Sequence, residues 1–117
     1  MIIAVTATRP RLDAPIADEV GDAPFFLVID TDCPVDFQAV ANPARRAASD
    51  ADILAVSTLV NLGAEVMITR HCSEDAERIL SLADVPVYET HGGTPRSALA
   101  DLQAGRLNRR PTLEHHP

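Results

Sequence analysis

Two short runs of polar residues carry side chains that could bind a metal or an anion. Arg70-His71-Cys72-Ser73 combines a guanidinium, an imidazole and a thiol, and His91-Gly92-Gly93-Thr94 combines an imidazole with paired glycines. Thiolate and imidazole suit iron, copper and iron–sulfur clusters. Glycines before a helix can turn backbone N–H groups toward an anion. These runs predict metal ligands (His71, Cys72, His91) and contacts to an anionic cofactor (Arg70, Gly92, Gly93, Thr94).

Each of these residues also has a simpler explanation. A cysteine is most often a small buried hydrophobe, and a histidine before Gly-Gly can serve only to shape a turn. Gly92 and Gly93 can provide unusual backbone angles without binding anything. Cys72 is singled out by its position, because it precedes Ser73, a helix-capping residue, and a helix N-terminus favours the thiolate.

Hydrophobic patterns predict the elements that position the two runs. Apolar and β-branched runs indicate five strands, at residues 2–7, 25–31, 35–41, 65–69 and 86–89. Capping residues and helical periodicity indicate three helices. The first begins after Ser49 or Asp50 and ends before Gly63, the second follows Ser73, and the third runs from Thr94, with Pro95 in its first turn, to Gly105.

The connections between these elements restrict the topology to one simple solution. The first three strands are joined by a loop and a turn that are too short for helical crossovers, so they should be antiparallel neighbours. The last two helices imply right-handed crossovers and parallel pairing. We therefore expect an α/β fold with a ribonuclease-H-like motif. Its mixed five-stranded sheet has the order 3-2-1-4-5, with strand 2 antiparallel to strands 1 and 3. Residues 1–106 form the single domain, and residues 107–117 form a flexible tail.

This topology predicts where the two polar runs lie. The carboxyl ends of strands 1, 4 and 5 share one edge of the sheet, where ligands bind in open α/β sheets. We therefore expect His71, Cys72 and His91 on a shared rim. Cys33 follows strand 2 and should lie at the opposite edge, about one strand length (15–20 Å) from Cys72. A disulfide between them is excluded at that distance.

The composition of the chain disfavours some classes of binding partner. The chain has 117 residues, a net charge of −7 and only 3% aromatic residues. An acidic surface with few aromatic side chains disfavours nucleic-acid binding. No run approaches the roughly 20 apolar residues of a membrane helix. The amino terminus reads as a strand and lacks the features of a signal peptide, so we expect a cytoplasmic protein.

The sequence disfavours two other functions, nuclease activity and nucleotide binding. Nucleases of this topology need clustered carboxylates that hold two metal ions. The first strand, residues 2–7, carries no acid, and the fourth ends in Thr69-Arg70-His71, again without one. Neither a G-x-G-x-x-G run nor a Walker sequence is present, which disfavours nucleotide binding.

Several short motifs follow one another in a recognisable order. They are Leu12-Asp13-Ala14-Pro15-Ile16, Gly21-Asp22-Ala23-Pro24-Phe25, Asn42-Pro43, Leu62-Gly63-Ala64-Glu65-Val66, and Val85-Pro86-Val87-Tyr88 followed by Gly93-Thr94 and Leu99. Each motif is weak alone. Their order and spacing over roughly residues 1–107 resemble the dinitrogenase iron–molybdenum cofactor biosynthesis family. That family includes NifX-like and NafY-like proteins and the C-terminal part of NifB-like proteins.

The resemblance implies a non-catalytic carrier of iron–molybdenum cofactor or an iron–sulfur precursor, with nitrogenase or cofactor-assembly proteins as partners. No cofactor is expected to be required for folding. The resemblance also places Glu19 and Gly21 in the cofactor site, although Glu19 stands where the family usually has histidine. Residues 43–49 lack the glycines that many members carry there. The alternative is a member that has lost cofactor binding and acts as a protein-interaction or regulatory module.

Overall fold

The computed structural model describes residues 1–33, 36–42 and 51–109. Its elements, in chain order, are β1 (Ile2–Ala7), β2 (Phe25–Asp30), β3 (Gln38–Ala41), α1 (Ala51–Asn61), β4 (Val66–Thr69), α2 (Glu74–Leu82), β5 (Val87–Glu89), α3 (Pro95–Gln103) and β6 (Asn108–Arg109). No helix in these ranges is both long and apolar enough to cross a bilayer.

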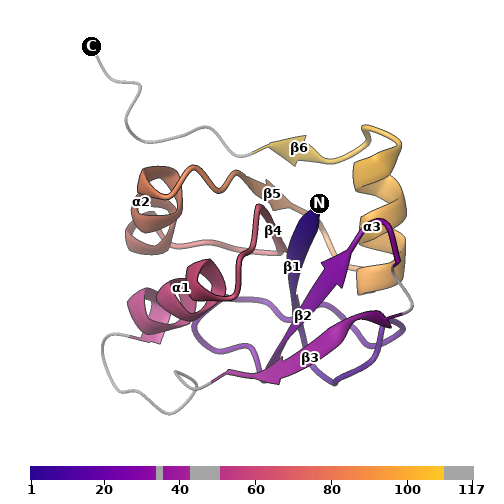
Figure 1. The fold of residues 1–117 in the computed structure, drawn as a ribbon, viewed down its shortest axis with the longest axis horizontal. Coiled ribbons are helices and arrows are strands. Elements are labelled where there is room, and N and C mark those ends of the chain that lie inside the picture. The colour runs from indigo at the N-terminus through magenta and orange to yellow at the C-terminus, as the bar shows by residue number, and fades with distance from the viewer. Residues whose placement is uncertain (34–35, 43–50, 110–117) are drawn as a thin grey trace.

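The strands form one mixed sheet in the order β3-β2-β1-β4-β5-β6 (Figure 1). β2 is antiparallel to both β1 and β3, whereas β1, β4 and β5 run parallel. The predicted order of the first five strands and their directions are therefore confirmed. The third strand begins at Gln38 and is shorter than predicted; Val35, where it was expected to begin, lies outside the described residues.

A short sixth strand lies in the segment that was predicted to be a flexible tail. Asn108 and Arg109 pair antiparallel with Glu89 and Tyr88 of β5. The tail prediction is therefore wrong for these two residues, because they form a short strand that pairs with β5 at the edge of the sheet. Two polar residues give no apolar pattern from which a strand could be predicted. The rest of the tail, residues 110–117, lies outside the described residues.

Helices cover both faces of the sheet: α1 and α2 lie on one face and α3 on the other (Figure 1). Side chains alternate along β1, so Ala4 packs toward α1 and α2, whereas Ile3 and Val5 pack toward α3. The first group belongs to what we call the α1–α2 core, which includes Phe26, Leu59, Met67, Cys72 and Leu80. The second belongs to the α3 core, which includes Leu27, Ile29, Ile68, Ala98 and Leu99.

Two of the predicted helix starts are confirmed by their hydrogen bonds. Ser73 caps α2 by accepting from the backbone N–H of Ala76, at 3.2 Å. Thr94 caps α3 in a reciprocal arrangement with Ser97, and Pro95 occupies the first turn. The predicted cap of the first helix, Ser49 or Asp50, lies outside the described residues. Both confirmed caps lie at the edge of the sheet where the polar runs were expected.

Candidate functional site

A segment that we call the strap, residues 12–23, crosses this edge from one face of the sheet to the other. Leu12 and Ile16 pack in the α3 core, and Ala17, Val20 and Ala23 pack in the α1–α2 core. The crossing point is fixed to β1 because the backbone N–H of Ala17 donates to the carbonyl oxygen of Thr6, at 3.2 Å. The strap therefore divides the carboxyl edge of the parallel strands into two sides.

The first side holds a cavity of about 410 Å³ lined by Glu19, Val20, His71, Cys72 and Ser73. We call it the thiol cavity. Its two walls are the strap and the loop between β4 and α2, which are joined by a 2.8 Å hydrogen bond from the backbone N–H of His71 to the carbonyl oxygen of Asp18. Cys72 is only 6% exposed and packs into the α1–α2 core. A ligand in this cavity would therefore meet the thiol at the floor and the exposed His71 at the rim.

Two buried hydroxyl groups support the thiol cavity from below. Thr6 Oγ1 lies 3.0 Å from Thr69 Oγ1 and 3.2 Å from the carbonyl oxygen of Ala17, within donating distance of both. Thr69 Oγ1 in turn lies 3.4 Å from the carbonyl oxygen of His71. These contacts connect β1, β4, the strap and the His71 loop. They fix the backbone on which His71 and Cys72 sit.

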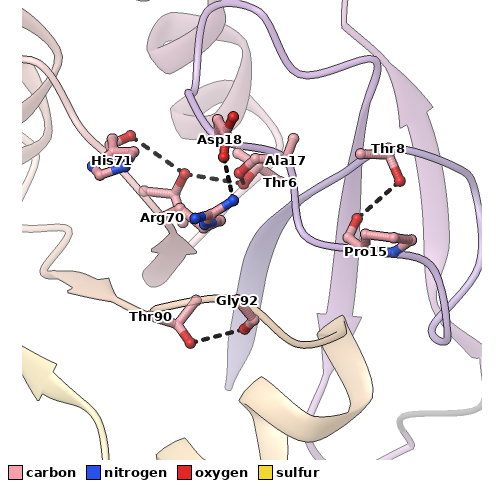
Figure 2. Close-up of polar contacts among 10 residues, drawn as sticks. Thr6, Thr8, Pro15, Ala17, Asp18, Arg70, His71, Thr90 and Gly92 are labelled. Atoms are coloured by element: carbon pink, nitrogen blue, oxygen red, sulfur yellow. Dashed lines mark hydrogen bonds and ion pairs between the residues drawn. The ribbon is translucent and has the colours of Figure 1, made fainter.

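Arg70 lies beside the thiol cavity and has a donor to spare. Its Nη1 forms an ion pair with Asp18 of the strap (Figure 2). Its Nε is buried, and within the described part of the chain it has no hydrogen-bond partner. Burying an unsatisfied N–H is unfavourable. Because this N–H is closed off from the surface, a ligand could reach it only if neighbouring side chains moved.

The second side holds a cavity of about 380 Å³, which we call the glycine cavity. Its lining is formed by Glu89, Thr90, His91, Gly92, Gly93, Asp101, Arg106 and Leu107. Gly92 and Gly93 have φ angles of 137° and 87°, which favour glycine. The strap also fixes this turn, because the backbone N–H of Ile16 donates to the carbonyl oxygen of Gly93, at 3.1 Å. Arg106 pairs with Asp101, at 2.9 Å, so its charge is largely compensated.

The structure thus separates residues that were expected on one rim. His71 and Cys72 share the thiol cavity with Glu19, whereas His91, Gly92 and Gly93 line the glycine cavity. Arg70, Gly21 and Thr94 line neither of these two cavities, and the hydroxyl of Thr94 is used in capping α3. Within the described ranges, no three His, Cys, Asp or Glu side chains are grouped as a metal ion requires.

Cys33 lies at the opposite edge, as predicted. β2 ends beside the start of β1, where the backbone N–H of Thr31 donates to the carbonyl oxygen of Met1, at 2.9 Å. Neither cysteine forms a disulfide. The Cys33 thiol donates to Oδ2 of Asp36, at 3.0 Å, and this hydrogen bond is the main cause of its raised pKa.

Sequence reasoning missed two residues that hold the strap in place. Asp18 pairs with Arg70, and the side-chain amide of Asn42 donates to carbonyl groups of the strap. In the sequence, Asn42 stands out only as part of the family-like Asn42-Pro43 pair. Its burial next to a loop gave no periodic signal, and only the preference for pairing buried amides could have indicated its role.

The family described as dinitrogenase iron-molybdenum cofactor matches residues 1–105 of this chain, which confirms the resemblance seen in the sequence. The apo orange protein from Desulfovibrio gigas is 28% identical, with a TM-score of 0.90 over 95% of this chain and 93% of that one. A protein from Thermotoga provisionally described as NifB is 27% identical, with a TM-score of 0.79 over 97% of both chains.

A protein from Methanocaldococcus jannaschii provisionally described as a dinitrogenase is 17% identical, with a TM-score of 0.70 over 96% of both chains. At that identity the likeness shows the fold alone. A search of curated proteins finds no match to this chain.

Proposed function

Because this chain belongs to the dinitrogenase iron–molybdenum cofactor family, we propose that it binds a preformed iron–molybdenum or iron–sulfur cluster as cargo and hands it on without catalysing a reaction. The cluster would sit in the thiol cavity. The observation that carries this proposal is the presence of a thiol and an imidazole, from Cys72 and His71, in one cavity at the amino end of α2.

The donor set suits a cluster better than a single metal ion. The thiol cavity offers two soft donors, whereas protein sites for one zinc ion use three or four ligands. A preformed cluster brings its own sulfide ligands and needs only one or two more from the protein. The dipole of α2 favours the negative charge that such clusters carry.

The same features favour release. Two ligands hold a cluster less firmly than a full set, and the cavity opens at the rim beside the exposed His71. Cys72 lies at the floor, where the amino end of α2 favours its thiolate. A transfer partner could therefore approach the His71 side first and displace the imidazole before the thiolate. Nitrogenase or a cofactor-assembly protein would be such a partner.

The test is anaerobic loading of the full chain with isolated iron–molybdenum cofactor, followed by gel filtration. The parent protein should co-elute with the brown cluster. Cys72→Ala and His71→Ala should each weaken binding about tenfold or more, since even outer-shell partners of metal ligands cost that much. Cys33→Ala is the matched control, because its thiol lies at the other edge, and it should load like the parent.

His91→Ala decides between the two cavities. Loss of loading in this variant, with normal loading of Cys72→Ala, would move the site to the glycine cavity. Equal loading of all variants would refute the proposed ligands.

A second candidate is a family member that has lost cluster binding and works through protein contacts. Two observations favour it: Glu19 stands at the cavity where an imidazole was expected, and Cys72 is packed among aliphatic side chains. A carboxylate is a poor ligand for a soft cluster. If the parent protein loads no cluster, the carrier proposal fails and the second candidate is favoured. Loading by Glu19→His would then show that the carboxylate at this position caused the loss.

A further inference from the structure

Asn42 lies just beyond the end of β3 and is buried. Its backbone N–H donates to the carbonyl oxygen of Pro24, at 3.1 Å, and so extends the pairing of β2 with β3. This anchors the residue on the sheet. The side chain is therefore held in a fixed place beside the strap.

The side-chain amide of Asn42 lies within hydrogen-bonding distance of three backbone carbonyl groups of the strap. Nδ2 lies 3.3 Å from the carbonyl oxygen of Val20, 3.2 Å from that of Gly21 and 2.9 Å from that of Ala23. These strap residues are themselves buried, so their carbonyl groups need a donor in place of water. An NH₂ group has two hydrogens to share among the three carbonyl groups.

The part of the strap that Asn42 holds is one wall of the thiol cavity. Glu19 and Val20 form this wall, and His71, Cys72 and Ser73 form the opposite one. The strap is also attached at this cavity by the 2.8 Å backbone hydrogen bond from His71 to Asp18 and by the pair between Arg70 and Asp18. The two side chains of that pair are 37% and 68% exposed, and exposed ion pairs contribute little. Of these two side-chain attachments, the buried amide of Asn42 is therefore the firmer.

We propose that Asn42 is a positioning residue of the thiol cavity: it fixes the Glu19–Val20 wall and thereby sets both the exposure of the Cys72 thiol and the fit of the cluster. The part of this inference that concerns the fit of the cluster rests on the proposed function. The part that concerns the exposure of the Cys72 thiol does not. Asn42 would touch neither the cluster nor its ligands. It would act only through the strap backbone.

The test measures alkylation of Cys72 by iodoacetamide in the native full chain, in a Cys33→Ser background so that one thiol reports. Asn42→Asp keeps the shape of the side chain but replaces the shared donor with an acceptor. Its Cys72 should react about tenfold faster, the change expected when buried carbonyl groups lose their donor and a local opening becomes easier. Asn42→Ala should also increase the rate at which Cys72 is alkylated.

A general loss of stability must be separated from a local effect. Ile29→Val and Ile29→Ala provide the control, because Ile29 lies in the α3 core, on the other face of the sheet. One compares Asn42→Asp with the Ile29 variant that loses the same amount in melting temperature. In that Ile29 variant, Cys72 should be alkylated at the same rate as in the parent. Equal acceleration in the matched Ile29 variant would overturn the inference.

The second arm measures binding of isolated iron–molybdenum cofactor to the same variants. Asn42→Asp should bind more weakly, while the matched Ile29 variant keeps the parent affinity. If the parent binds no cofactor, the proposed function fails, and the thiol arm still decides the role of Asn42. Unchanged alkylation of Cys72 in both Asn42 variants would overturn that role whatever the binding arm shows.

Discussion

The thiol of Cys33 donates a hydrogen bond to Asp36, and this contact raises its pKa, as does the negative charge of the same carboxylate. A raised pKa keeps the thiol protonated, and the protonated form is a poor metal ligand. Cys72 is instead buried and lines the thiol cavity at the amino end of α2. This position in the cavity supports Cys72, and not Cys33, as the proposed ligand.

A residue-scale prediction concerns Asp13 and Arg96, which join the strap to α3 through a 2.8 Å hydrogen bond. This hydrogen bond, aided by the charge of Arg96, holds the pKa of Asp13 below its usual 3.8. A group whose pKa is lowered by folding stabilises the protein above its unfolded pKa, and the contribution is lost as pH falls through the folded value. Asp13→Asn should therefore lower the melting temperature slightly at neutral pH, and the difference should shrink as the pH falls below 3.8, the usual pKa of the carboxyl group.

The measurement is a series of thermal melts from neutral to acidic pH. Arg96→Gln should reproduce the effect of Asp13→Asn, and the double variant should be no worse than either single one, because both remove the same contact. A difference that persists undiminished in acid would mean that Asp13 stabilises the fold through packing instead of charge.

At the scale of the element, the turn before α3 contains a glycine with a positive φ angle next to the residues that cap the helix. Gly93 has a φ of 87°, and a Cβ added there would lie 2.7 Å from Ser97 Oγ. Ser97 Oγ accepts from the backbone N–H of Thr94, at 2.9 Å, and completes the capping box. The glycine therefore permits both the backbone turn and the cap. Neither role requires a bound ligand.

Gly93→Ala should destabilise the protein by about 1–3 kcal/mol, since it adds left-handed strain and disturbs the cap. The control is Gly105→Ala, whose φ is also positive, 74°, but whose added Cβ would meet nothing within 4 Å. Chemical denaturation of both variants measures the difference. A smaller loss for Gly93→Ala than for Gly105→Ala would show that the Ser97 contact yields without cost.

Most elements could be predicted from the sequence because their signals are local. β1, β2 and β4 are apolar runs, and Ser73 and Thr94 are capping residues that act within three positions. The topology followed from the lengths of the connections. The short β6 carries no such signal, since its two polar residues pair with β5 residues that lie on the other side of α3 in the sequence.

For the candidate site, the sequence predicts only the edge of the sheet at which it lies. Parallel strands bring the His71 and His91 loops to the same side of the sheet, and this was visible in the topology. The division into two cavities depends on the strap, whose contacts join residues far apart in the chain, such as Asp18 with Arg70 and Val20 with Asn42. No local pattern encodes such pairs.

At the scale of the whole molecule, the strap connects the layers of the fold. It packs in both cores and contacts β1, the His71 loop and the turn before α3. A ligand that moves one wall of the thiol cavity therefore acts on a segment that is also hydrogen-bonded to Gly93 of the glycine cavity. The chain has a net charge of −7, so the proposed anionic cargo would depend on local donors such as the amino end of α2.

The most direct test of the account is an anaerobic NMR titration of the ¹⁵N-labelled full chain with isolated iron–molybdenum cofactor, whose paramagnetism broadens nearby amide signals. The account predicts broadening first at Glu19, Val20, His71, Cys72 and Ser73, with the signals of Thr31 and Cys33 still sharp. Broadening centred on Cys33, or spectra that do not change at all, would contradict a cluster site at the thiol cavity.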